Sequence, residues 1–87
     1  MREEWMKNWF TIGEIIDKNT KKRCETLGYR IGRKCYIWND GFQVEKSLLV
    51  NYEDDVYFFT TPIEDFYQDD YGVWVITKNR EYRFDNI

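Results

Sequence analysis

The sequence predicts one small, mainly β domain over residues 1–87, with a minor helical part. Seventeen of the 87 residues are aromatic, and alanine, the strongest helix former, is absent. The apolar residues are mostly aromatic or β-branched, which favours strands. A chain of this length forms one modest core. We therefore expect a curved antiparallel sheet of about five strands, or a small open barrel.

The first ten residues allow two interpretations. Four apolar residues recur at helical spacing and predict a short N-terminal helix: Trp5, Met6, Trp9 and Phe10. Residues 9–12 equally fit the beginning of a strand, and periodicity does not separate these alternatives. We predict a first strand from Phe10 to Ile16, with Phe10, Ile12 and Ile16 on one side.

The central part of the chain predicts three further strands. The charged segment from Lys18 to Cys24 is expected to be a loop or a blunted edge that protects the sheet. A strand over 34–38 is followed by the turn signal Asn39-Asp40-Gly41. Residues 42–52 are expected to return as a strand, and residues 56–60 to form a buried strand.

Residues 62–68 are predicted to form a short helix. Thr61 and Glu64 have the spacing of a capping box, in which each side chain bonds the other residue's backbone N–H. Pro62 occupies the first helical position, where its missing N–H costs nothing. Thr61 is accordingly expected to cap this helix.

Residues 72–87 have the pattern of a β-hairpin with one apolar face. Trp74 and Ile76 alternate with Val73, Val75 and Thr77, and Tyr82 and Phe84 follow a turn at Lys78-Asn79. We expect Trp74 and Phe84 on the buried face. On that basis Trp74→Ala is predicted to cost about 3–5 kcal/mol.

The composition argues against an enzyme. Histidine, the commonest general acid and base, is absent. Cys24 and Cys35 are expected to be free thiols, with a disulfide as the minor alternative, and two thiolates without histidine do not complete a zinc site. The acidic pairs could hold Mg²⁺ or Ca²⁺, but their spacing matches no calcium loop. We expect no catalytic residue, metal or cofactor.

Charge divides the chain into two parts. Residues 1–46 carry ten basic and seven acidic side chains, whereas residues 47–77 carry seven acidic side chains and no Lys or Arg. Six aromatic residues lie among these carboxylates, and they cannot all point inward if the strand and helix alternate. Exposed rings in an acidic field favour a protein-binding surface. The predicted partner-binding residues are Glu53, Asp54, Asp55, Glu64, Asp65, Tyr67, Asp69, Asp70 and Tyr71.

The predicted partner is a protein with a basic surface. On the predicted helix Asp65 and Asp69 would lie about 6 Å apart along the axis, a spacing that could imitate successive phosphates. In composition the chain resembles small acidic, aromatic-rich inhibitors from phages and other mobile elements, such as anti-CRISPR and anti-restriction proteins. That resemblance implies inhibition of a nucleic-acid-handling protein. An acidic domain within a larger assembly is the plainer alternative.

A single-stranded nucleic-acid-binding module is the second hypothesis. The basic run from Lys18 to Lys34 offers cations for phosphates, and Tyr36 and Trp38 offer rings for stacking bases. The residues assigned to this alternative are Lys21, Lys22, Arg23, Arg30, Arg33 and Lys34. The N-terminus lacks an apolar signal core, so a cytoplasmic location without membrane association is expected. Nothing in the sequence sets the oligomeric state.

Overall fold

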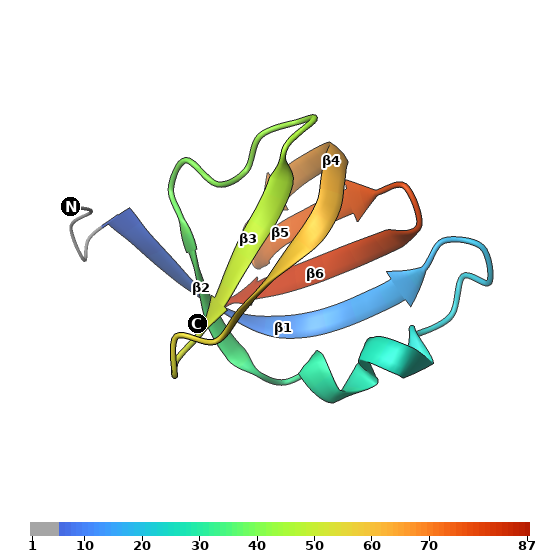
Figure 1. The fold of residues 1–87 in the computed structure, drawn as a ribbon, viewed down its shortest axis with the longest axis horizontal. Helices are drawn as coiled ribbons and strands as arrows, with labels where there is room; N and C mark the ends of the chain where they lie inside the picture. Colours follow the sequence, from blue (N-terminus) through green and yellow to red (C-terminus); the bar gives the residue numbers. More distant parts are fainter. Residues whose placement is uncertain (1–5) are drawn as a thin grey trace.

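The chain folds into a closed six-stranded barrel. The computed structural model describes residues 6–87. The strands are β1 (Lys7–Asp17), β2 (Lys34–Trp38), β3 (Ser47–Tyr52), β4 (Tyr57–Asp69), β5 (Gly72–Thr77) and β6 (Arg80–Asn86), and a 3-10 helix, η2 (Glu25–Arg30), lies between β1 and β2. Each strand pairs antiparallel with its neighbours in sequence, and β6 pairs with β1 (Figure 1). The predicted fold class is confirmed.

The segment between β1 and η2 covers a part of the edge of β1 that β2 leaves unpaired. Residues 18–24 form turns between β1 and η2, as predicted for a loop. β2 pairs with β1 only over Lys7–Thr11, and further along β1 the segment takes its place: the Cys24 N–H donates to the Ile15 carbonyl and the Asp17 N–H donates to the Lys22 carbonyl, at 2.8 and 2.9 Å. The segment therefore covers this part of the edge of β1, as expected. Within residues 6–87 no helix is long and apolar enough to cross a membrane.

The core fills the inside of the barrel. Its largest fully buried side chains are Phe84, Ile12, Ile15, Ile37, Leu48 and Ile63. A register shift between Ile12 and Glu14 changes the alternation of β1, so Ile15 and not Ile16 follows Ile12 inward. The prediction that Ile16 shares the side of Phe10 and Ile12 is therefore wrong. Cys24 and Cys35 are both buried free thiols, as expected.

The C-terminal hairpin is confirmed, but the faces of its first strand are reversed. Val73 pairs with Phe84, and Trp74 pairs with Arg83. Residues that oppose each other on paired strands point to the same face, so Val73 points inward with Phe84. Trp74 points outward with Arg83, whose guanidinium lies 5.2 Å from the centroid of the Trp74 ring. The interior of a small barrel has room for valine at this position. The prediction that Trp74 lies on the buried face is wrong.

The predicted helix over 62–68 is wrong, because these residues belong to β4. Residues 57–62 of β4 pair with β3, and residues 63–69 pair with β5. Thr61 is exposed, and it is the Thr60 hydroxyl that accepts a hydrogen bond from the Leu48 N–H, at 3.0 Å. Pairing with two strands satisfies more backbone groups than one capping box. Pro62 is opposite Ser47 in β3, next to a register shift between Ser47 and Leu49, and prolines within sheets are tolerated at such irregularities.

Helical structure occurs elsewhere instead. The helix η2 lies inside the segment that the sequence marked only as basic, and it follows the outside of the barrel beside β1 (Figure 1). From Lys7 onward the N-terminal segment is strand, so the predicted N-terminal helix fails there. Its remaining residues, 1–5, lie outside the described residues.

Candidate functional site

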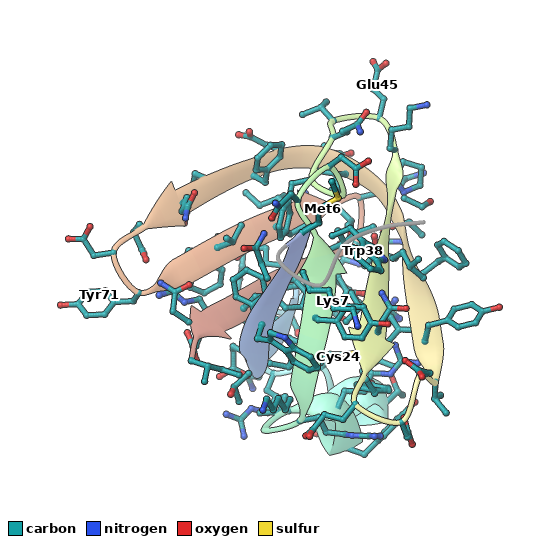
Figure 2. All side chains as sticks on the ribbon, turned by 90° about the vertical axis from the view of Figure 1, so that its left-hand side faces the viewer. Met6, Lys7, Cys24, Trp38, Glu45 and Tyr71 are labelled. Atoms are coloured by element: carbon teal, nitrogen blue, oxygen red, sulfur yellow. The ribbon has the colours of Figure 1, made fainter. Side chains whose placement is uncertain are left out.

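The outer face of β4 carries most of the exposed aromatic surface. Phe58, Thr60 and Ile63 point into the barrel, and their neighbours point outward. The exposed fractions are 59% for Tyr57, 61% for Phe59 and 51% for Tyr67, and Tyr71 in the following turn is 75% exposed. Figure 2 shows Tyr71 projecting from the end of the β4–β5 hairpin. The expectation that some rings in this region point outward is confirmed.

Tyr57 and Phe59 form the most concentrated part of this surface. Their ring centroids lie 5.7 Å apart at an interplanar angle of 81°. Across the sheet they are opposed by Asn51 and Leu49, whose side chains leave them uncovered. Exposing two large rings side by side in water is unfavourable, so this arrangement is typical of a contact surface.

The predicted acidic residues lie at three places along β4. Glu53, Asp54 and Asp55 form the turn before the strand, Glu64 and Asp65 lie at its middle, and Asp69 and Asp70 lie at its far end. Along the curved strand, at about 3.3 Å per residue, the path from one end of β4 to the other is about 40 Å. In a strand Asp65 and Asp69 are separated by about 13 Å. The predicted 6 Å spacing between Asp65 and Asp69 is therefore wrong, and these two carboxylates do not imitate successive phosphates in the way a helix would have allowed.

Two of these seven carboxylates are in ion pairs. Glu64 Oε1 lies 3.3 Å from Lys18 Nζ. Asp69 accepts hydrogen bonds from both terminal nitrogens of Arg83, at 2.8 and 3.2 Å, and Arg83 also donates to Asp85. Within residues 6–87 the other five carboxylates have no cation within salt-bridge distance: Glu53, Asp54, Asp55, Asp65 and Asp70.

Several of the acidic residues also build turns. Asp54 Oδ1 accepts from the Val56 N–H, and Asp55 Oδ1 accepts from the Tyr36 hydroxyl, at 3.2 Å in each case. Asp69 Oδ1 accepts from the N–H groups of Tyr71 and Gly72, at 2.8 and 3.0 Å. Carboxylates at turns are favoured for this local bonding. These residues therefore contribute both to the fold and to the negative field along β4.

The Asp69 carboxylate is expected to make stability depend on pH. Hydrogen bonds from Arg83, and then from the Tyr71 backbone, lower the pKa of Asp69 below its ordinary 3.8. A lowered pKa in the folded state contributes stability that is present above the ordinary pKa and lost as the pH falls below it. Asp69→Asn keeps a side-chain oxygen that can accept the hydrogen bonds of the turn. The midpoint of urea denaturation should therefore change less between about pH 5 and pH 2 in this variant than in the wild type. Identical acid dependence in both proteins would contradict this assignment.

The basic run does not form one patch. Arg23 is bound to Glu14, at 2.7 and 3.0 Å. Arg30 and Arg33 each lie 3.8 Å from a ring centroid, of Phe58 and Tyr52 respectively. Lys34 lies 5.0 Å from the Trp9 ring. Lys21 and Lys22 stay exposed in the β1–η2 turn. The barrel thus divides the residues assigned to nucleic-acid binding among several places.

Tyr36 and Trp38 lie together on the outside of β2. Tyr36 packs between Trp9, at 5.1 Å, and Trp38, at 5.6 Å between centroids. Lys7 Nζ lies 4.4 Å from the Tyr36 ring, and Figure 2 shows Lys7 beside Trp38. Tyr36 is buried in this group. It therefore offers no open face for a base, although the sequence assigned it that role.

The described residues offer few groups of the kinds that enzymes use for catalysis. In residues 6–87 no group of three or more Cys, Asp or Glu side chains gathers where a metal could bind. Burial raises the pKa of the Cys35 thiol to about 12, which keeps it protonated at neutral pH. The Thr26 hydroxyl lowers the pKa of Cys24, but its side chain is buried as well.

A pocket of about 330 Å³ opens at one end of the barrel. It lies between the start of β1, the loop after β2, the inner side of the β4–β5 hairpin and the end of β6. Its lining consists of Asn8, Trp9, Phe10, Asn39, Phe42, Phe66, Gln68, Val73 and Asn86. This pocket could not be predicted from the sequence, because its residues come from separate parts of the chain and form no motif.

Comparison of the chain with protein-family models, with curated protein sequences and with solved structures finds no match.

Proposed function

We propose that this protein is a binding module for another protein, and that the outer face of β4 is its contact surface. The observation that carries the proposal is the row of exposed rings on this strand and the turn that follows it, formed by Tyr57, Phe59, Tyr67 and Tyr71. Such rings bring large contact area with few rotatable bonds, and tyrosine is enriched at interface hot spots.

The charges around these rings favour a basic partner. Five carboxylates that form no ion pair within residues 6–87 lie along and beside β4, and residues 47–77 contain no Lys or Arg. A nucleic acid approaching this face would be repelled, whereas a basic protein surface would be attracted and its association accelerated. The basic surface of a nucleic-acid-handling protein is one surface of this kind.

The division of the basic run weakens the nucleic-acid alternative. Arg23 is neutralised by Glu14, and Arg30 and Arg33 cover rings of the barrel. Phosphate binding along a strand needs several cations in one groove. Lys21, Lys22 and Lys34 have no carboxylate within salt-bridge distance among the described residues, but Lys34 lies at Trp9, away from the turn that holds the other two. We therefore rank single-stranded nucleic acid second.

The proposal is tested by affinity capture from nuclease-treated lysate of the native host. We expect the wild-type protein to retain a basic protein, and the double variant Tyr57→Ser/Phe59→Ser to lose it, because the two adjacent rings are removed. The control, Tyr29→Ser, removes an exposed ring of η2, outside β4, and should retain the same protein.

Two outcomes of this capture would contradict the proposal. One is equal recovery of the partner by the β4 variant and the wild type. The other is recovery that disappears on nuclease treatment, which would show that nucleic acid holds the material on the column.

A further inference from the structure

The pocket at the end of the barrel has an unusual lining for a chain so rich in charge. One third of all residues are Asp, Glu, Lys or Arg, yet none of the nine lining residues is charged. The chain has eight Asn and Gln residues in total, and half of them meet in this pocket. The four are Asn8, Asn39, Gln68 and Asn86.

The floor of the pocket is aromatic. Phe42 and Phe66 lie 5.8 Å apart with an interplanar angle of 34°, and Phe10 meets Phe42 edge-on at 6.2 Å. Phe10 and Val73 are buried, Trp9, Phe42 and Phe66 are half-buried, and the four carboxamides are exposed at the rim. An apolar floor with a few polar groups at the rim is the usual construction of a small-molecule site.

The carboxamides retain free hydrogen-bonding groups. Asn8 Nδ2 donates to Asn39 Oδ1, which holds these two side chains together. Their other atoms, Asn8 Oδ1 and Asn39 Nδ2, have no partner in residues 6–87 and supply an acceptor and a donor. The Gln68 side chain likewise has no partner among the described residues. Asn86 Nδ2 donates to the Asp70 carbonyl at 3.3 Å, and its Oδ1 stays available.

This chemistry selects a neutral, planar ligand. A phosphate or carboxylate would find no cation in the lining, and an amine would find no carboxylate. A carboxamide presents a donor and an acceptor in one plane, which matches the edge of a nucleobase, and aromatic rings stack on its face. We propose that the pocket binds a nucleobase, either of a free nucleoside or of an unstacked nucleotide in a single strand.

This site is separate from the contact surface on β4. Phe66 and Gln68 line the pocket from the inner side of the strand, whereas Tyr67 points outward. The nucleobase site can therefore be tested independently, and its failure would leave the proposed protein contact untouched.

The experiment is an NMR titration of the ¹⁵N-labelled protein with adenosine, guanosine, cytidine and uridine. We expect at least one nucleoside to give saturable shifts at concentrations on the order of 1 mM. The shifts should affect the side-chain amides of Asn8, Asn39, Gln68 and Asn86. The other four carboxamides of the chain are an internal control, because their side-chain amide signals should not shift: Asn19, Gln43, Asn51 and Asn79.

A matched pair of variants tests the role of the rim. Gln68→Met keeps the length of the side chain but removes its donor and acceptor, and it should weaken nucleoside binding about fivefold. Gln43→Met changes the only other glutamine, outside the pocket, and should leave binding unchanged. Preserved backbone spectra show that both variants fold.

A ten-nucleotide single strand distinguishes the two sources of the base. Tighter binding than the nucleoside, weakening linearly with the logarithm of salt concentration, supports the site and assigns it to nucleic acid. Equal affinity supports the site and assigns it to free nucleosides. The proposal is overturned by no saturable shift with any nucleoside, by equal shifts in the control carboxamides, or by the same pocket shifts with methyl glucoside or a neutral peptide amide instead.

Discussion

Phe84→Ala should lower the free energy of unfolding by about 3–5 kcal/mol, as expected for truncating a fully buried phenylalanine. Phe84 is inaccessible to solvent, and its ring lies 6.1 Å from the rings of both Phe10 and Tyr82. A domain of this size has a total stability of about 5–15 kcal/mol. Urea denaturation followed by tryptophan fluorescence should show a large loss of stability or an unfolded protein.

Trp74→Ala is the matched control in the same hairpin. Trp74 lies on the outer face under Arg83, so its removal should cost only about 1 kcal/mol. Far-ultraviolet circular dichroism is the common readout, since this variant loses one fluorophore. If Trp74→Ala proved the more damaging of the two changes, the assignment of the hairpin faces would be wrong.

Gly72→Ala should destabilise the barrel by about 3 kcal/mol or more through steric overlap. A Cβ at this position would lie 1.9 Å from the carbonyl oxygen of Phe84. The colliding atom belongs to the backbone of the paired strand, so the clash cannot be relieved by rotating a side chain. Thermal unfolding should show a strongly lowered midpoint.

Gly28→Ala controls for the loss of glycine flexibility. An added Cβ at Gly28, in η2, meets nothing within 4 Å. The free energy of unfolding should therefore change by less than about 1 kcal/mol. Equal effects of the two substitutions would refute the close approach of β5 and β6 at Gly72.

The sequence predicted strands well where their pattern was local. The strand over 34–38 and the final hairpin were found because a turn signal follows each apolar run. The orientation of β5 was not predictable in the same way. Both of its faces are apolar, with Trp74 and Ile76 on one side and Val73 and Val75 on the other. Only the partner strand decides which set is buried.

The failure at 62–68 has a different physical origin. The capping pattern at Thr61 and Glu64 is a local signal, worth about 1 kcal/mol. Pairing of β4 with β3 and β5, its neighbours in sequence, satisfies backbone groups along the whole strand and contributes more. The strand pairing therefore outweighs the local helical preference, and only the local preference is visible in the sequence alone.

The candidate site was predicted in composition but not in arrangement. The acidic and aromatic residues of 53–71 are visible in sequence, and their exposed rings follow from strand alternation. Which carboxylates keep free charge depends on Lys18 and Arg83, which reach Glu64 and Asp69 from other strands. The pocket required the closed barrel, because its four carboxamides meet only when the chain ends and the hairpin come together.

The most direct test of the proposed function compares two variants against the captured partner by calorimetry at one ionic strength. Tyr57→Ser/Phe59→Ser should raise the Kd about a hundredfold, the combined effect of two hot-spot rings. Lys21→Gln/Lys22→Gln/Lys34→Gln removes free cations away from β4 and should change the Kd less than about threefold. The opposite result, with the basic variant losing the partner and the aromatic variant keeping it, would contradict the assignment of β4 as the contact surface.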